Sequence, residues 1–123
     1  MEMENKTTAL KWVLYREVDV PRDIEEILVT GEVAEHAFKT VRDVAVFTNK
    51  RLIVKDVQGL TGTKVEMYSL PYSSVHMWST ENAGILDFSS EVELWTRAGH
   101  IKIELKRGID IRKFERLLAE YIL

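Results

Sequence analysis

The sequence contains no cysteine, only two prolines and only six glycines among its 123 residues. The absence of cysteine excludes a disulfide scaffold, a thiol nucleophile and any cysteine-ligated zinc or iron–sulfur site. So few prolines and glycines argue against a linker-rich or disordered chain. No run approaches the roughly 18–20 apolar residues of a membrane-spanning helix. What remains is the composition of one globular domain, with 46% hydrophobic and 30% charged residues.

A surplus of basic residues is also missing. The chain has 17 Lys and Arg against 20 Asp and Glu, a net charge of −3, so we expect no nucleic-acid partner. The acidic start Met1-Glu2-Met3-Glu4 is unlike the basic start of a signal peptide, which predicts a cytoplasmic location.

Charge is unevenly distributed along the chain. Residues 1–36 hold 4 basic and 9 acidic side chains, whereas residues 97–123 hold 7 basic and 4 acidic ones. These opposite charges can pair within one chain or between neighbouring chains.

Helical patterns occur at both ends of the chain. Pro21, followed by acidic residues and apolar residues at helical spacing, predicts a short helix within Val20–Val29. We interpret Thr7–Val18 as a second short helix. Asp110 is a favourable N-cap for a C-terminal amphipathic helix with one apolar stripe.

Between these ends the period of the apolar residues changes to two, which is typical of strands with one buried face. Turn residues separate seven such segments: Glu32–Lys39, Asp43–Thr48, Arg51–Val57, Thr63–Leu70, Val75–Thr80, Glu91–Thr96 and His100–Lys106. The connections are short, so we expect antiparallel pairing. The predicted fold is mainly β, a sandwich or partly open barrel closed by the C-terminal helix.

Residues 41–53, VRDVAVFTNKRLI, resemble the RD-x-x-VFTNKRLI signature of the bacterial pleckstrin-homology (PH) family. Residues 56–62, DVQGLTG, are similar to its D-x-QG-x-TG turn. The resemblance covers about residues 20–123, which leaves residues 1–19 as a leader segment. It implies a PH-like split barrel of seven antiparallel strands capped by a C-terminal helix. It also implies ring-shaped homo-oligomers with five-fold symmetry, without implying a biochemical role.

Catalytic and metal-binding patterns are absent from the sequence. The three histidines, His36, His76 and His100, each stand alone in a predicted strand and form no chelating pair. No nucleophile elbow, Walker loop or dinucleotide fingerprint is present. We therefore expect no enzymatic activity, no catalytic residue, no metal and no cofactor.

Two groups of residues are candidates for interactions. Polar and aromatic residues near the predicted turns could bind a partner: Thr48, Asn49, Arg51, Asp56, Gln58, Thr61, Tyr72 and Glu81. A structural role is the favoured alternative, in which they fix the turns, for instance through an Arg51–Asp56 ion pair. Trp12, Trp78 and Trp95 could cover a subunit interface or pack within the chain. Trp95 shares its strand face with Glu91 and Glu93, which predicts an outward side chain.

These observations predict a non-enzymatic PH-like interaction scaffold. It would form a ring-shaped homo-oligomer and present a polar surface to a protein or peptide partner. The alternative is a membrane-recruitment module that binds anionic lipid headgroups through Lys39, Arg42, Lys50 and Arg51. We disfavour it, because the first predicted hairpin offers only Lys39 and Arg42 where several cations are needed.

Overall fold

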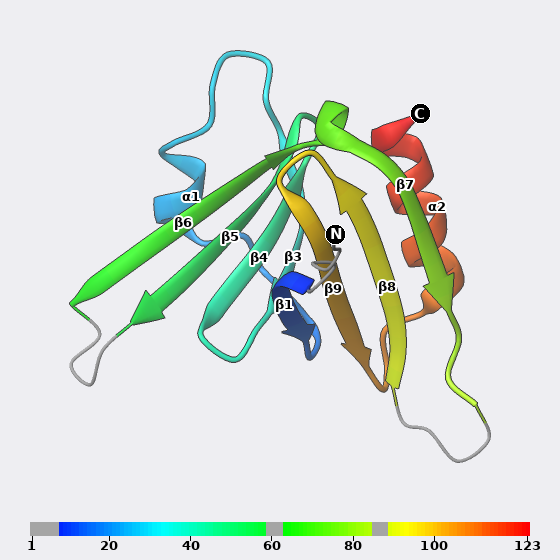
Figure 1. The fold of residues 1–123 in the computed structure, drawn as a ribbon. Coiled ribbons are helices and arrows are strands. Elements are labelled where there is room, and N and C mark those ends of the chain that lie inside the picture. The colour runs from blue at the N-terminus through cyan, green and yellow to red at the C-terminus, as the bar shows by residue number, and fades with distance from the viewer. Residues whose placement is uncertain (1–7, 59–62, 85–88) are drawn as a thin grey trace.

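The computed structural model describes residues 8–58, 63–84 and 89–123, which fold into two β-sheets and two α-helices. In chain order the elements are β1 (Thr8–Leu14), β2 (Glu17–Val18), α1 (Arg22–Glu25), β3 (Ala34–Lys39), β4 (Asp43–Thr48), β5 (Arg51–Gln58), β6 (Lys64–Pro71), a 3₁₀ turn (Tyr72–Ser74), β7 (Val75–Glu81), β8 (Ser89–Thr96), β9 (Gly99–Lys106) and α2 (Ile111–Ile122). One sheet has the order β2-β3-β4-β5-β6 and the other the order β1-β9-β8-β7. Figure 1 shows the two sheets splayed apart, with α2 beside β7.

The predicted mainly β fold with a C-terminal helix is confirmed. The seven predicted strands correspond to β3 to β9, and every pairing among these seven is antiparallel. In β9 the alternating residues Ile101, Ile103 and Leu105 are buried, while Lys102 and Glu104 between them are more exposed. The strict alternation of apolar and polar residues therefore predicted the buried face of β9 correctly.

The predicted helix over Thr7–Val18 is wrong, because β1 and β2 form there. Leu10, Trp12 and Leu14 are spaced by two residues and face the core, and Leu14 is only 1% exposed. β1 pairs with β9 in parallel, so the sheet is not wholly antiparallel. Parallel strands are not joined by a short turn, so no turn motif beside β1 indicated its pairing with β9. The helix predicted within Val20–Val29 exists but is shorter, since α1 spans only Arg22–Glu25.

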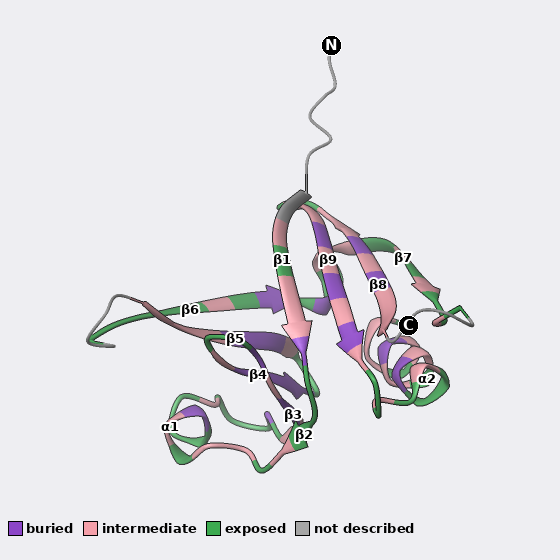
Figure 2. Cartoon of the chain, turned by 90° about the horizontal axis from the view of Figure 1, so that it is seen from below, coloured by how far each residue is buried: buried purple, intermediate pink, exposed green. Residues whose placement is uncertain are grey.

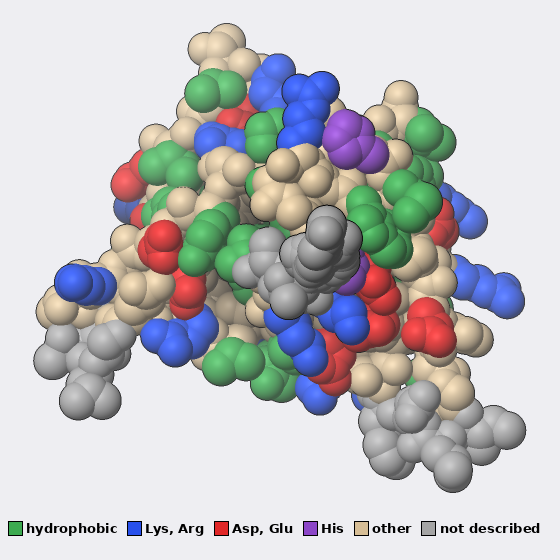
Figure 3. Space-filling view, viewed as in Figure 1, with side chains coloured by type: hydrophobic (Ala, Val, Ile, Leu, Met, Phe, Trp, Pro, Cys, Tyr) green, Lys and Arg blue, Asp and Glu red, His purple; other side chains and the backbone are tan. Residues whose placement is uncertain are grey.

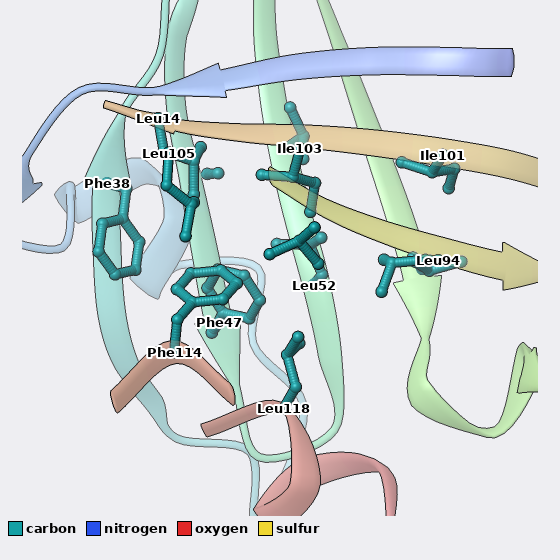
Figure 4. Packing of buried hydrophobic residues seen from close by; sticks show 14 of the residues in the cluster. Leu14, Phe38, Phe47, Leu52, Leu94, Ile101, Ile103, Leu105, Phe114 and Leu118 are labelled. Atoms are coloured by element: carbon teal, nitrogen blue, oxygen red, sulfur yellow. The ribbon is translucent and has the colours of Figure 1, made fainter. Parts of the chain in front are cut away.

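Two apolar clusters hold the fold together. The larger lies between the sheets and α2, where the rings of Phe38, Phe47 and Phe114 meet edge to face with centroids 5.4–5.9 Å apart (Figure 4). The smaller lies beneath α1, where Ile24 contacts the outer face of β3, β4 and β5. β4 is thus covered on both faces, which explains its continuous apolar run and its buried colour in Figure 2.

The C-terminal helix begins at the predicted cap. The Asp110 carboxylate accepts hydrogen bonds from the backbone N–H groups of Arg112 (2.9 Å) and Lys113 (3.4 Å). Phe114 and Leu118 are its buried residues. A capped helix with one apolar face closes the open side of the barrel.

Candidate interaction surfaces

The turn that joins β4 to β5 is fixed by a buried carboxylate. The side chain of Glu32 is fully buried, and its Oε2 accepts hydrogen bonds from Arg51 Nε (2.8 Å) and Thr48 Oγ1 (2.7 Å). Its Oε1 accepts from Arg51 Nη2 (3.1 Å) and from the Val29 N–H (3.0 Å). Arg51 therefore forms a bidentate ion pair with Glu32, which connects the segment before β3 to the β4–β5 turn.

Neighbouring side chains extend this connection. Asn49 accepts a hydrogen bond from the Val33 N–H (2.8 Å) and donates one to the Gly31 carbonyl (3.0 Å). Gly31 has a φ of 80°, which a residue with a side chain rarely adopts. The Tyr72 hydroxyl donates to the Thr48 carbonyl over 2.7 Å. We call Glu32, Thr48, Asn49, Arg51 and Tyr72 the turn lock.

The turn lock changes the acidity of two of its members. The Arg51 guanidinium, helped by the Val29 N–H and the Thr48 hydroxyl against the cost of burial, lowers the pKa of Glu32 to about 2. Burial raises the pKa of the Tyr72 hydroxyl, so it stays a neutral hydrogen-bond donor. The lock therefore contains one stable charge pair at neutral pH.

The expected Arg51–Asp56 ion pair is wrong. The two residues are five positions apart on β5, and an odd separation places side chains on opposite faces of a strand. Arg51 pairs with Glu32, while Asp56 lies 3.3 Å from Arg42 Nε. Sequence analysis missed Glu32, because its partner lies 19 residues away on another element.

The other partner-binding candidates lie elsewhere. Asp56 and Gln58 are at the far end of β5, where Gln58 Nε2 donates to Glu66 Oε1 over 2.9 Å. Glu81 is exposed at the end of β7, in the other sheet. Thr61 lies outside the described residues. The structure thus brings together Thr48, Asn49, Arg51 and Tyr72, and separates them from the other described candidates.

Two of the three tryptophans pack within the chain. Trp12 contacts the larger cluster and lies 5.9 Å from the Tyr68 ring, centroid to centroid. Trp78 packs against the same cluster, and its Nε1 donates to the Glu115 carboxylate of α2 over 3.2 Å. Both side chains are partly buried by contacts within the chain.

Trp95 is different, because it lies on the outer face of the four-stranded sheet. Its ring stacks on His100 with centroids 5.0 Å apart, and His100 Nε2 lies 2.7 Å from Glu93 Oε1. The strand register places Met77, which is 54% exposed, directly beside Trp95. Figure 3 shows hydrophobic side chains beside a histidine over this sheet. We call Trp95, His100 and Met77 the outer aromatic patch.

The four cations considered for lipid binding form no single cluster. Lys39 and Arg42 flank the β3–β4 turn, whereas Lys50 and Arg51 flank the β4–β5 turn. A strand of this length separates the two turns by roughly 17 Å. Arg51 is held in the turn lock, and Arg42 donates to the Val57 carbonyl over 2.9 Å. Two of the four charges are therefore already engaged within the chain.

A hollow of about 480 Å³ lies between β3 and α2. Phe38, Ile109, Phe114 and Leu117 are its apolar lining residues, and charged side chains including Lys113 and Arg116 surround them. No sequence motif indicated this hollow, because its walls come from residues about 80 positions apart.

Within residues 8–58, 63–84 and 89–123, no group of three or more His, Asp or Glu side chains could hold a metal ion. Neither helix of this part of the chain is long and apolar enough to cross a membrane.

The two-sheet barrel with a capping C-terminal helix defines a PH-like protein. A sequence profile described as "Bacterial PH domain" matches residues 5–122. The chain belongs to this bacterial PH domain family.

Similar proteins agree with this assignment. YjqA of Bacillus subtilis strain 168, described as uncharacterised, is 41% identical over 103 residues, covering 81% of this chain and 82% of YjqA. A solved structure of a PH-domain protein from Shewanella loihica PV-4 is 34% identical, with a TM-score of 0.79 and coverage of 88% of this chain and 97% of that one. A PH domain from Shewanella amazonensis SB2B is 39% identical, with a TM-score of 0.66 and coverage of 83% and 84%.

Proposed function

We propose that this protein is a non-enzymatic interaction scaffold that forms a ring-shaped homo-oligomer and presents a polar surface to a protein or peptide partner. The observation that carries the proposal is the outer aromatic patch. The half-buried Trp95 and the exposed Met77 lie side by side on a sheet that also carries the charged pair Glu93 and Lys102. Partly exposed aromatic and methionine side chains surrounded by polar residues are typical of protein interfaces.

The distribution of charge supports a head-to-tail contact between copies. Asp19, Glu25 and Glu26 are exposed in and beside α1, while Arg112, Lys113 and Arg116 are exposed on α2. A ring requires two different surfaces on each subunit that fit one another. Opposite charges on two separate elements meet that requirement and orient the subunits.

The polar surface of this proposal is the tip of the β4–β5 hairpin. Asn49 and Lys50 are exposed there, and the turn lock holds the backbone of the hairpin in one shape. In this account Thr48, Arg51 and Tyr72 position the turn. A rigid turn repeated around a ring would offer several equal contacts to one partner.

The substitution Trp95→Glu tests the interface. It places a charge in the outer aromatic patch, so we expect a lower mass in light scattering after size exclusion, while the far-UV circular dichroism spectrum stays that of the folded barrel. Val65→Glu is the matched control, because Val65 is 49% exposed on β6 of the other sheet. An unchanged mass for Trp95→Glu, or an equal loss in both variants, would contradict the assignment of this patch.

The membrane alternative is less well supported, because its four cations lie at two distant turns. If it holds, liposomes containing phosphoinositides will sediment the protein in a salt-sensitive manner. Our proposal expects the protein to stay in the supernatant.

A further inference from the structure

The edge of β3 extends beyond its neighbour β2. β2 pairs only with Ala37 and Phe38 of β3, and the chain then leaves the sheet toward α1. On its other side β3 pairs with β4 along its length, from Ala34 to Lys39. Within the described part of the chain, no strand pairs with Ala34–His36 on the β2 side. An unpaired strand edge is a template for an added strand.

Two hollows flank this edge, one on each face of the sheet. The first is the 480 Å³ hollow toward α2, which is lined by His36 and Phe38 of β3. The second, about 360 Å³, is lined by Ala37 of β3 and by Val18 and Val20. Glu17 and Glu35 border both hollows. Side chains of an added strand would point alternately into the two hollows.

The two hollows differ in chemistry. The hollow toward α2 has a floor of aromatic and aliphatic side chains, with Phe38 and Phe114 side by side in Figure 4 and 5.8 Å apart between centroids. The second hollow is lined by three carboxylates, Glu17, Asp19 and Glu35, and by no Lys or Arg. Glu17 and Glu35 also line the first hollow, where Lys113 and Arg116 offset their charge, so Asp19 is the carboxylate particular to the second.

His36 Nδ1 lies 3.0 Å from Glu17 Oε2. The Tyr121 hydroxyl donates a hydrogen bond to Glu35 Oε1. Each carboxylate keeps further acceptor capacity. The first hollow therefore suits an apolar side chain, and the second suits a Lys or Arg whose stem packs on valine.

We propose that the edge of β3 at Ala34–His36 binds an extended segment of another protein, in which apolar and basic residues alternate. The segment continues the line of β2 and adds one strand to the five-stranded sheet. In this chain β9 has such a pattern, but both of its edges are already paired. The edge strand β1 has it only over residues 10–12. The proposed occupant is therefore a different protein, and binding of a second copy through β1 would contradict the proposal. This site is separate from the tip of the β4–β5 hairpin, and the inference does not depend on ring formation.

Selection from a phage-displayed library of random nine-residue peptides on the full-length protein tests this site. We expect enriched peptides to alternate apolar residues with Lys or Arg. Synthetic peptides of the enriched sequence are then titrated by fluorescence anisotropy. Asp19→Lys should weaken their binding by about fivefold, near the upper limit for an exposed ion pair. Glu66→Lys, an equal charge change on an exposed residue of β6 outside both hollows, should leave the affinity unchanged.

Amide hydrogen exchange locates the bound peptide. We expect the amides of residues 34–36 to gain protection when the peptide is present. The proposal is overturned if no peptide is enriched, if the enriched peptides bind Asp19→Lys as tightly as the unaltered protein, or if protection appears at β6 or β7 instead. The oligomeric mass is measured in the same samples, so a monomeric protein that binds peptide would reject the ring and keep this site.

Discussion

At the scale of single residues, the family signature acts through the turn lock. Thr48, Asn49 and Arg51 form hydrogen bonds with neighbouring segments of the chain. The residue that organises them is Glu32, whose buried carboxylate meets the Arg51 guanidinium. A buried charge needs such partners, because an unpaired one is costly.

Replacing Glu32 by Gln should lower the free energy of unfolding by about 2–3 kcal/mol. The substitution leaves Arg51, which is only 23% exposed, without its charged partner, and breaking a fully buried pair costs about 3–5 kcal/mol. Urea denaturation measures the change. Glu25→Gln on the exposed side of α1 is the control and should stay within about 0.5 kcal/mol. Equal losses in both variants would contradict the role of the turn lock.

The same carboxylate makes stability depend on pH. Arg51 lowers the pKa of Glu32 from an ordinary 4.5 to about 2 in the folded protein. A lowered folded-state pKa stabilises the fold above the unfolded pKa, and this contribution is lost as the pH falls from about 5 to 2. The contribution at neutral pH is about 3 kcal/mol.

Other carboxyl groups, including Asp23 beside Lys55, also have a lowered pKa. The contribution of Glu32 is therefore isolated only by the difference in unfolding free energy between the unaltered protein and Glu32→Gln. Unfolding free energies of the unaltered protein and of Glu32→Gln should converge between pH 5 and pH 2. Parallel curves over this range would show that Glu32 is not the group that titrates.

At the scale of elements, β1 is integrated into the barrel rather than appended to it. It pairs with β9 over most of its length and inserts Leu14 into the larger cluster. A leader outside the core would tolerate truncation of its apolar side chains.

Leu14→Ala should therefore destabilise the protein by about 2–5 kcal/mol, the usual cost of removing a buried leucine side chain. Lys11→Ala is the matched control on the same strand, because Lys11 is exposed and should change stability by less than about 0.5 kcal/mol. Thermal and urea unfolding both report the difference. A neutral Leu14→Ala would mean that β1 contributes nothing to the core.

The strands with clear alternation could be predicted, and those without it could not. β9 alternates over its whole length, so its place and its buried face follow from local sequence. In β1 the spacing of Leu10, Val13 and Leu14 also fits a helix, and only the distant partner β9 decides between the two. Whether a segment forms a helix or a strand was therefore predictable only where the spacing of its apolar residues fits one of the two.

At the scale of the whole molecule, the family resemblance predicted the architecture but not the surfaces. The outward direction predicted for Trp95 follows from the acidic residues on its face, and the strand register agrees. The Glu32–Arg51 pair and the hollow beside β3 both join segments distant in sequence. Such features depend on how elements pack, which no local pattern encodes.

The central claim is that the chain works as an assembled ring, and sedimentation velocity of the unaltered protein tests it most directly. Across micromolar concentrations we predict a single species whose mass is a whole multiple, near five, of the 14.3 kDa chain. A species that keeps the 14.3 kDa mass at every concentration would contradict the account.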